Sequence, residues 1–180
     1  MTGRSPALGL LAWAAGVASA SISGAVHADP RSPTPCAEWD LGILVRHVAD
    51  SAATIRELLE GSPPAGPPPA GCGAARAELR RLAEAIDSTP PNRPDLDLTA
   101  LTGAYELAVH AWDIDRATGR PDQLPIGLVD TLLVYAPAVL GEIERCGLFA
   151  AEVPPLETRT DTDRLLAMFG RRGNQPLRGD

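Results

Sequence analysis

Apolar residues recur every three or four positions along most of the chain, which is the spacing of amphipathic helices. The clearest stripe runs from Leu41 to Leu59, and Asp40 before it is a good N-cap residue. We predict a helix here that ends near Glu60, because Gly61 follows it. No segment shows a sustained alternation of apolar and polar residues, so no strand is predicted.

The same spacing predicts further helices, separated by segments rich in proline and glycine. They cover about residues 6–28, 74–87, 99–118 and 126–145, and a short helix follows a cap at Asp161 or Thr162. Pro137 should kink or split the helix at 126–145. We therefore predict an all-α protein, a bundle of four main helices with an additional short C-terminal helix, forming a single domain over residues 1–180.

The first predicted helix has a competing interpretation. Arg4, the apolar run at 7–15 and the small residues at 18–20 imitate a secretory signal. Pro6 and the helical spacing of the following apolar residues equally suit a buried bundle helix, and the run is too short for an ordinary membrane span. Without this segment only three substantial helices without an internal proline would remain. We therefore expect a bundle helix, a cytoplasmic protein and no membrane partner.

Composition excludes several classes of function. The chain has 180 residues, a net charge of −7 and 16 basic residues, all of them Arg. The absence of Lys excludes a Walker phosphate loop and Schiff-base chemistry, and an acidic chain with scattered Arg is not expected to bind nucleic acid. The three cysteines, Cys36, Cys72 and Cys146, are far apart, so neither a disulfide framework nor a zinc ribbon is indicated and we expect ordinary thiols.

Candidate chemistry lies on the helix predicted at 99–118. One stripe of this helix is apolar and belongs to the core: Leu101, Tyr105, Ala108 and Trp112. A second stripe carries Glu106, His110 and Asp113. Glu106 and His110 are one turn apart, so they can bind one metal ion or simply hydrogen-bond to each other. This spacing is common in proteins without a metal.

A third ligand has to come from another helix. His47 lies at the edge of the apolar stripe of helix 41–60, where a histidine is usually a partly exposed surface residue but where two helices can also meet. His27 is the alternative. Two imidazoles and one carboxylate leave open coordination positions, which is typical of catalytic metal sites. The same set matches the facial triad of non-haem iron enzymes.

Four segments carry a resemblance to a known family. They are TPCAEWD at 34–40, LVRHV at 44–48, ELAVHAWD at 106–113 with RATG at 116–119, and DRLLAMFG at 163–170. The chain resembles the DinB-like superfamily, in particular the actinobacterial group that includes the metal-binding N-terminal domain of mycothiol-dependent maleylpyruvate isomerase. The resemblance implies an up-down four-helix bundle, a first helix that belongs to the domain, and one divalent ion bound by His47, Glu106 and His110.

The resemblance also implies a class of function. We expect a metal-dependent thiol S-transferase or isomerase that uses a low-molecular-weight thiol such as mycothiol on a small electrophile. Zn²⁺ is the expected ion, with Ni²⁺ or Fe²⁺ as alternatives. Asp113 would support a ligand or handle a proton, while Arg116 and Arg46 would anchor an anionic substrate or the thiol. The isomerase has a second domain and this chain stops near residue 180, so maleylpyruvate itself is not the expected substrate.

Two other functions stay open at this point. The bundle could bind a metal or ligand without turnover, or the same triad could serve a non-haem iron enzyme. A homodimer is compatible with each of these functions.

Overall fold

The structure, a computed structural model, describes residues 4–36, 39–121, 124–142, 152, 160–172 and 177. The helices within them are α1 (Pro6–Gly24), α2 (Leu41–Glu60), α3 (Cys72–Ser88), a 3₁₀ turn η1 (Pro94–Leu96), α4 (Asp97–Ala117), α5 (Ile126–Glu142) and α6 (Asp161–Met168). The one β feature in these residues is an isolated bridge between Pro33 and Asp40. The predicted all-α fold is confirmed.

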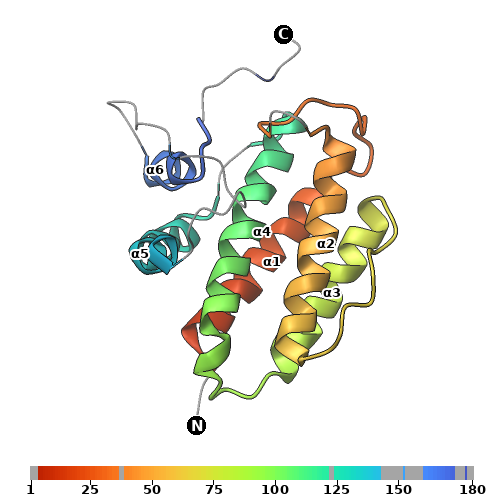
Figure 1. Cartoon of the computed structure of the whole chain (residues 1–180). Helices are drawn as coiled ribbons and strands as arrows, with labels where there is room; N and C mark the ends of the chain where they lie inside the picture. The colour runs from red at the N-terminus through yellow and green to blue at the C-terminus, as the bar shows by residue number, and fades with distance from the viewer. Residues whose placement is uncertain are drawn as a thin grey trace.

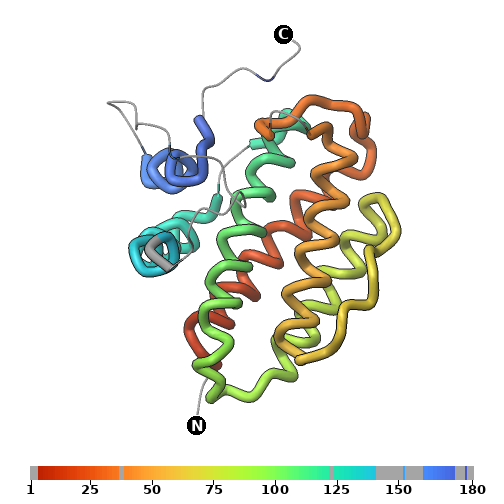
Figure 2. The backbone as a smooth tube through the Cα atoms, viewed as in Figure 1, coloured from red at the N-terminus to blue at the C-terminus, as the bar shows by residue number. Residues whose placement is uncertain are grey.

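Helices α1 to α4 form the bundle, and α5 and α6 lie together beside it (Figure 1). Helix α1 runs parallel to α4, because Ser5 bonds to Asp97 near the start of both helices and Ser21 bonds to Asp115 near their ends. The connector at 62–71 carries the chain back along the bundle, so α3 runs parallel to α2 (Figure 2). The predicted up-down order therefore holds from α1 to α2 and from α3 to α4.

Helix ends follow the capping residues. The Asp40 side chain accepts a hydrogen bond from the Ile43 amide at 2.8 Å, and Gly61 ends α2 in the left-handed conformation with φ 66°. Both predictions for α2 are confirmed. Helix α1 ends at Gly24 rather than near residue 28, because the chain turns there and the Ala25 amide bonds back to Ser21 and Ile22.

Near the C-terminus one prediction needs correction, and one of the two alternatives expected at Pro137 is excluded. The cap of α6 is Thr160, not Asp161 or Thr162, because the Thr160 hydroxyl accepts from the Asp163 amide while the Asp163 carboxylate accepts from the Thr160 amide. Helix α5 continues past Pro137 to Glu142 and is not split there. Residues 143–145 of the predicted helix lie outside the described residues.

Helix α4 is the central element of the core. Helices α1, α2 and α5 all pack against it, and the predicted core stripe of Leu101, Tyr105, Ala108 and Trp112 is buried. Burial raises the pKa of Tyr105, whose hydroxyl donates to the Leu132 carbonyl oxygen of α5 at 2.5 Å. Because α4 is buried on most sides, the polar residues on its second stripe need partners within the protein.

The apolar run at 7–15 was expected to be too short for a membrane span, but the whole helix α1, Pro6–Gly24, is long and apolar enough to cross a membrane, judged by length and composition only. Half of this apolar segment is buried inside the protein. Leu8, Leu11, Ala14 and Ile22 are completely buried in the common core. In this structure α1 therefore packs as a helix of the bundle.

Candidate metal centre

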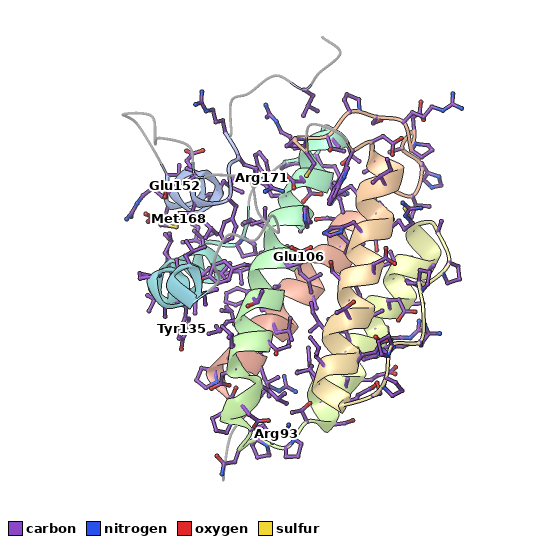
Figure 3. The ribbon with its side chains drawn as sticks, viewed as in Figure 1. Arg93, Glu106, Tyr135, Glu152, Met168 and Arg171 are labelled. Atoms are coloured by element: carbon purple, nitrogen blue, oxygen red, sulfur yellow. The ribbon has the colours of Figure 1, made fainter. Side chains whose placement is uncertain are left out.

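Three side chains from two helices converge between α2 and α4. His47 lies on α2, and Glu106 and His110 lie on α4; their ligand atoms are all within 4.8 Å of one another. Both histidines direct Nε2 at the same Glu106 oxygen, Oε1, at 2.5 Å from His47 and 3.4 Å from His110. Glu106 points from α4 towards α2 (Figure 3). The structure thus brings together the three residues that the sequence suggested as ligands.

Asp113 fixes the orientation of the His110 ring. Its Oδ2 lies 2.9 Å from His110 Nδ1, so the other ring nitrogen, Nε2, is left to face Glu106 and His47. A carboxylate that holds the far nitrogen of a histidine is the usual support of a metal-binding imidazole. Asp113 is fully buried, so this pair is shielded from water.

A second ring of contacts surrounds Asp113 and includes two residues that the sequence analysis missed. Arg171, from the segment after α6, places Nη2 2.9 Å from Asp113 Oδ2 and 3.3 Å from Cys36 Sγ. Its Nη1 donates to the Phe169 carbonyl oxygen at 2.6 Å. Cys36 Sγ is also 3.3 Å from Asp113 Oδ2. The segment after α6 therefore reaches back to the bundle and neutralises the buried carboxylate.

Neither Cys36 nor Arg171 was identified by spacing. Cys36 looked like an ordinary thiol with no histidine near it in sequence, and Arg171 is 135 positions from Cys36. The available signal was the segment at 163–170, which ends directly before Arg171. Cys72 is partly buried at the start of α3, and Cys146 lies outside the described residues.

The pKa shifts follow from burial and pairing. Burial alone would raise the pKa of Glu106, but hydrogen bonds to His110 and His47 hold it well below its usual range. Burial alone would lower the pKa of His110, but Asp113, Cys36 and Glu106 raise it well above its usual value. For Asp113, Arg171 and His110 outweigh burial and lower the pKa. The cluster therefore stabilises anionic carboxylates and attracts positive charge.

Two neighbours complete the cluster. Ser51 of α2 donates a hydrogen bond to Glu106 Oε1 at 2.9 Å. The Trp39 ring packs against His47, with centroids 4.5 Å apart, and against His110 at 5.8 Å. Trp39 thus shields both imidazoles on one side.

The remaining candidates lie elsewhere. Arg46 is exposed on α2 beside His47, and Arg116 is partly exposed in the last turn of α4. His27 is exposed in the turn after α1. None of these three belongs to a metal-ligand group within the described part of the chain, so the structure does not support His27 as the third ligand. The anchoring roles of Arg46 and Arg116 stay predictions.

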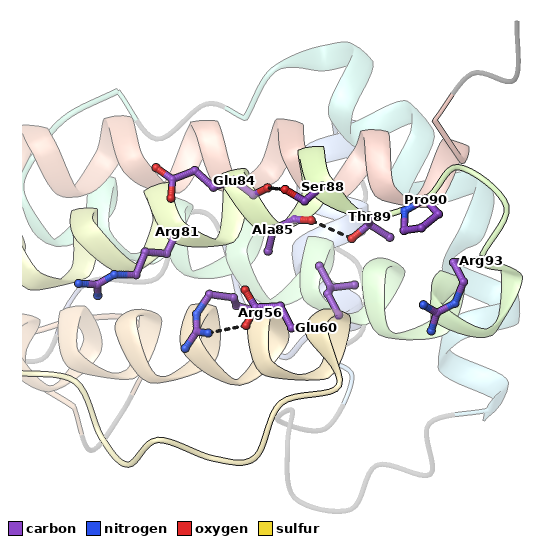
Figure 4. A pocket seen from close by; sticks show the side chains of 10 residues that line it. Arg56, Glu60, Arg81, Glu84, Ala85, Ser88, Thr89, Pro90 and Arg93 are labelled. Carbon is purple, nitrogen blue, oxygen red and sulfur yellow. Dashed lines mark hydrogen bonds and ion pairs between the residues drawn. The ribbon is translucent and has the colours of Figure 1, made fainter.

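Two hollows flank α2. The first, here called the α2–α4 groove, has a volume of about 570 Å³ and includes His47 and Glu106 in its wall. Its full lining is His47, Asp50, Ser51, Thr54, Ile55, Leu58, Leu98, Thr99, Thr102, Gly103 and Glu106. The second, here called the α2–α3 cavity, has about 430 Å³ and lies at the C-terminal ends of α2 and α3, with Arg56, Arg81 and Arg93 in its wall (Figure 4). The groove is therefore the hollow that opens onto the candidate metal ligands.

Comparison with known proteins identifies the family. A family model described as the mycothiol maleylpyruvate isomerase N-terminal domain matches residues 12–115. The chain belongs to this family. The uncharacterized proteins MT0763 and Rv0738, from Mycobacterium tuberculosis strains CDC 1551 / Oshkosh and H37Rv, are each 30% identical to it over 169 residues. Each match covers 86% of this chain and 92% of the relative. No solved structure gives a significant match.

Membership of the isomerase N-terminal domain family places the chain among mycothiol-related, metal-binding DinB-like proteins. The matched residues include His47, Glu106, His110 and Asp113. Arg171 lies beyond the match, so its contact with Asp113 was found in the structure and not in the family comparison.

Proposed function

We propose that the chain is a metal-dependent enzyme that joins a low-molecular-weight thiol of the mycothiol type to a small electrophile, as an S-transferase or an isomerase. The observation that carries this proposal is the convergence of His47, Glu106 and His110, with His110 held by Asp113. A simple hydrogen bond between Glu106 and His110 would need neither a third ligand from α2 nor a carboxylate that orients His110. A metal site uses both.

The donor set fits a divalent transition-metal ion. Two imidazole nitrogens and one carboxylate suit Zn²⁺, and they also suit Fe²⁺ or Ni²⁺. Three protein ligands leave at least one position for a thiol or water. When bound, a Zn²⁺ ion would lower the pKa of a thiol at that position, so that the nucleophilic thiolate forms at neutral pH.

The chain's own residues would orient and shield the reaction. Glu106 and His47 line the α2–α4 groove, so they face whatever enters it, while Trp39 limits water on the histidine side. In the reaction the S–H bond breaks with loss of the proton to water, and sulfur forms a bond to the electrophilic carbon. In a transferase the leaving group departs with its electron pair. In an isomerase the anionic adduct takes up a proton and rotates about the carbon–carbon bond that was double before the addition. It then loses that proton and expels the thiolate, which takes a proton back from water.

Metal analysis of purified protein tests the proposal. The wild type should bind one Zn²⁺ per chain, and His47→Ala, Glu106→Ala and His110→Ala should each lose stoichiometric metal. His27→Ala is the matched control, because this exposed histidine lies outside the cluster and should leave metal content unchanged. Full metal retention by all three ligand variants would show that the site is wrong.

Thiol consumption then separates the enzyme from its rivals. Zinc-loaded protein should consume thiol in the presence of an electrophile, and the ligand variants should not. Metal binding without any thiol-dependent turnover would favour a non-catalytic binding module. Iron content with oxygen uptake would favour a non-haem iron enzyme and overturn the transferase proposal.

We further propose a cytoplasmic protein that binds neither membranes nor nucleic acid and that can form a homodimer. The packing of α1 inside the bundle supports the first part. Ile126 and Val134, on α5, are the most exposed large apolar residues in the described part of the chain, at 79% and 76%, and they offer a contact surface. Light scattering of the wild type and of Val134→Ser tests the dimer.

A further inference from the structure

The α2–α4 groove has a shape and chemistry that go beyond its two metal-ligand residues. Its α2 wall runs from His47 to Leu58, which corresponds to about 16 Å along a helix at 1.5 Å per residue. The groove is therefore long enough for a molecule that extends well past the candidate metal centre. One end is polar, at His47 and Glu106, and the other end is bounded by Leu58 and Leu98.

The far end of the groove is apolar and open. Leu58 and Leu98 are 56% and 50% exposed, although both are large apolar side chains that would gain from being covered. Ile55 lies between them and the polar end. At Gly103 the Ile55 side chain packs directly on the α4 backbone: a Cβ atom there would lie only 2.8 Å from Ile55 Cδ1, which is too close for a side chain. These contacts favour an apolar tail in this half of the groove.

The polar half contains an acceptor without a partner. Asp50 Oδ1 is buried, and no described group donates a hydrogen bond to it. A buried carboxylate oxygen of this kind needs a donor, because leaving it without one is costly. Asp50 lies one turn before Thr54 on the same wall of α2, so a ligand in the groove passes it.

The charged side chains that line the groove are acidic. Its acidic side chains are Asp50 and Glu106, and its lining contains no Arg, while the chain contains no Lys. Of the two arginines of α2, Arg46 is exposed and does not line the groove, and Arg56 lines the α2–α3 cavity and pairs with Glu60 at 2.7 Å. A carboxylate beside Asp50 would therefore find no cation in the lining of the groove to balance it.

We infer that the α2–α4 groove binds the electrophile, and that it selects an elongated, largely apolar molecule without carboxylates, whose hydrogen-bond donor or cationic group reaches Asp50. The inference rests on the proposed function for the identity of this ligand as the electrophile. It also excludes maleylpyruvate, the substrate in the family's name, as the ligand of this groove, because maleylpyruvate carries two carboxylates.

Binding of unreactive ketones tests this inference directly. The probes are 4-phenylbutan-2-one and its para-carboxylate and para-aminomethyl derivatives, titrated into zinc-loaded protein without thiol and followed by calorimetry. The neutral and cationic ketones should bind at least about tenfold more tightly than the carboxylate, because only the carboxylate is repelled by Asp50. Asp50→Asn, which keeps the shape of the side chain, should remove most of this discrimination.

A second pair of variants tests the apolar end. Leu98→Ser should weaken the neutral ketone about three- to tenfold, because apolar contact with the phenyl ring is lost. Ile126→Ser is the matched control, since Ile126 is an exposed apolar residue on α5, outside the groove. It should leave the affinity unchanged.

Several outcomes would overturn the inference. These are equal or tighter binding of the carboxylate, equal effects of Leu98→Ser and Ile126→Ser, absence of binding by all three ketones at millimolar concentration, or displacement of the neutral ketone by the thiol. The last result would place the thiol, not the electrophile, in the groove.

His110→Ala distinguishes this inference from the proposed function. His110 is a candidate metal ligand but does not line the groove. Suppose that wild type neither binds zinc nor turns over thiol, but that wild type and His110→Ala both bind the neutral ketone more tightly than the carboxylate. The groove inference then stands and the proposed function is wrong. If zinc and turnover are as expected but the ketones show no preference, only the groove inference is wrong.

Discussion

The two polar regions along α2 are built from similar residue types but in different ways. At the α2–α3 cavity, arginines pair with carboxylates close to them in sequence: Arg56 with Glu57 and Glu60, Arg81 with Glu78, and Arg93 with Asp95. At the candidate metal centre His110 has local partners in Glu106 and Asp113. The other pairs join residues distant in sequence, His47 with Glu106 and Asp113 with Arg171. The local pairs form within one or two helical turns, although they leave the buried Nε of Arg56 without a hydrogen-bond partner. The distant pairs exist only because the fold brings their residues together.

This difference shows which of the two regions can serve a ligand. In the α2–α3 cavity the arginines already have carboxylate partners, such as Glu60 for Arg56 (Figure 4). At the metal centre two imidazole nitrogens face a single carboxylate oxygen in a partly buried setting. The first region pairs its charges one to one, while the second concentrates ligand atoms around one point. Four predictions test this difference between the two regions.

The largest effect should follow from Arg171→Ala. Removing this side chain leaves the fully buried Asp113 without its guanidinium, and loss of one partner of a buried ion pair typically costs about 3–5 kcal/mol. Urea unfolding of metal-free protein measures the free energy of unfolding. Arg164→Ala, which breaks an exposed pair with Asp161 on the same terminal segment, should cost less than about 1 kcal/mol.

Equal destabilisation of Arg171→Ala and Arg164→Ala would show that the buried pair with Asp113 contributes no more than an exposed pair. A double variant, Asp113→Asn with Arg171→Met, sharpens the test. It should be less destabilised than the sum of the two single changes, because it leaves no buried charge unpaired.

Removal of the metal should have the next largest effect. At a metal concentration about 100 times Kd, binding to the folded state adds about 2.7 kcal/mol, which for a chain of this length corresponds to about 5–11 °C in Tm. Thermal unfolding with and without a chelator measures this shift. The Tm of Glu106→Gln should not change when the chelator is added. A wild-type Tm that is the same with and without chelator would contradict the metal site.

Asp113→Asn should weaken metal binding without removing a ligand. Loss of the carboxylate that holds His110 Nδ1 typically lowers metal affinity about 10- to 100-fold. Competition with a zinc chelator of known affinity measures the change. Asp115→Asn is the matched control, because Asp115 lies on the same helix but bonds to Ser21 and Arg120. Equal losses in both variants would indicate a general effect on α4 and no specific support of His110.

The smallest effect should come from the α2–α3 cavity. Glu84→Gln removes one side of the exposed pair with Arg80, whose side chains are both 69% exposed. The free energy of unfolding should change by less than about 0.5 kcal/mol, and metal content should stay the same. A large effect on either quantity would show that the two regions are coupled and not independent.

The sequence predicted the helices and the ligands with different success. Asp40, Gly61 and the stripe on α2 gave that helix its limits, because capping and helical spacing are local properties. The end of α1 and the cap of α6 were wrong by a few residues, since several small or hydroxyl residues there can serve equally well. The expected up-down order was wrong for α3, which runs parallel to α2, because spacing within a helix contains no information on its direction relative to its neighbours.

What the sequence alone determined is therefore the local part of this protein: an all-α chain, most helix limits, the stripe of Glu106 and His110, and the lack of Lys that makes a metal ion the expected source of reactivity. Only the tertiary structure showed that His47 meets that stripe, that Asp113 is held by Arg171, and that Asp50 lines the groove while its buried Oδ1 has no hydrogen-bond partner. Helical spacing acts over one or two turns. Long-range contacts depend on how whole helices cross and run, which emerges from packing the entire core.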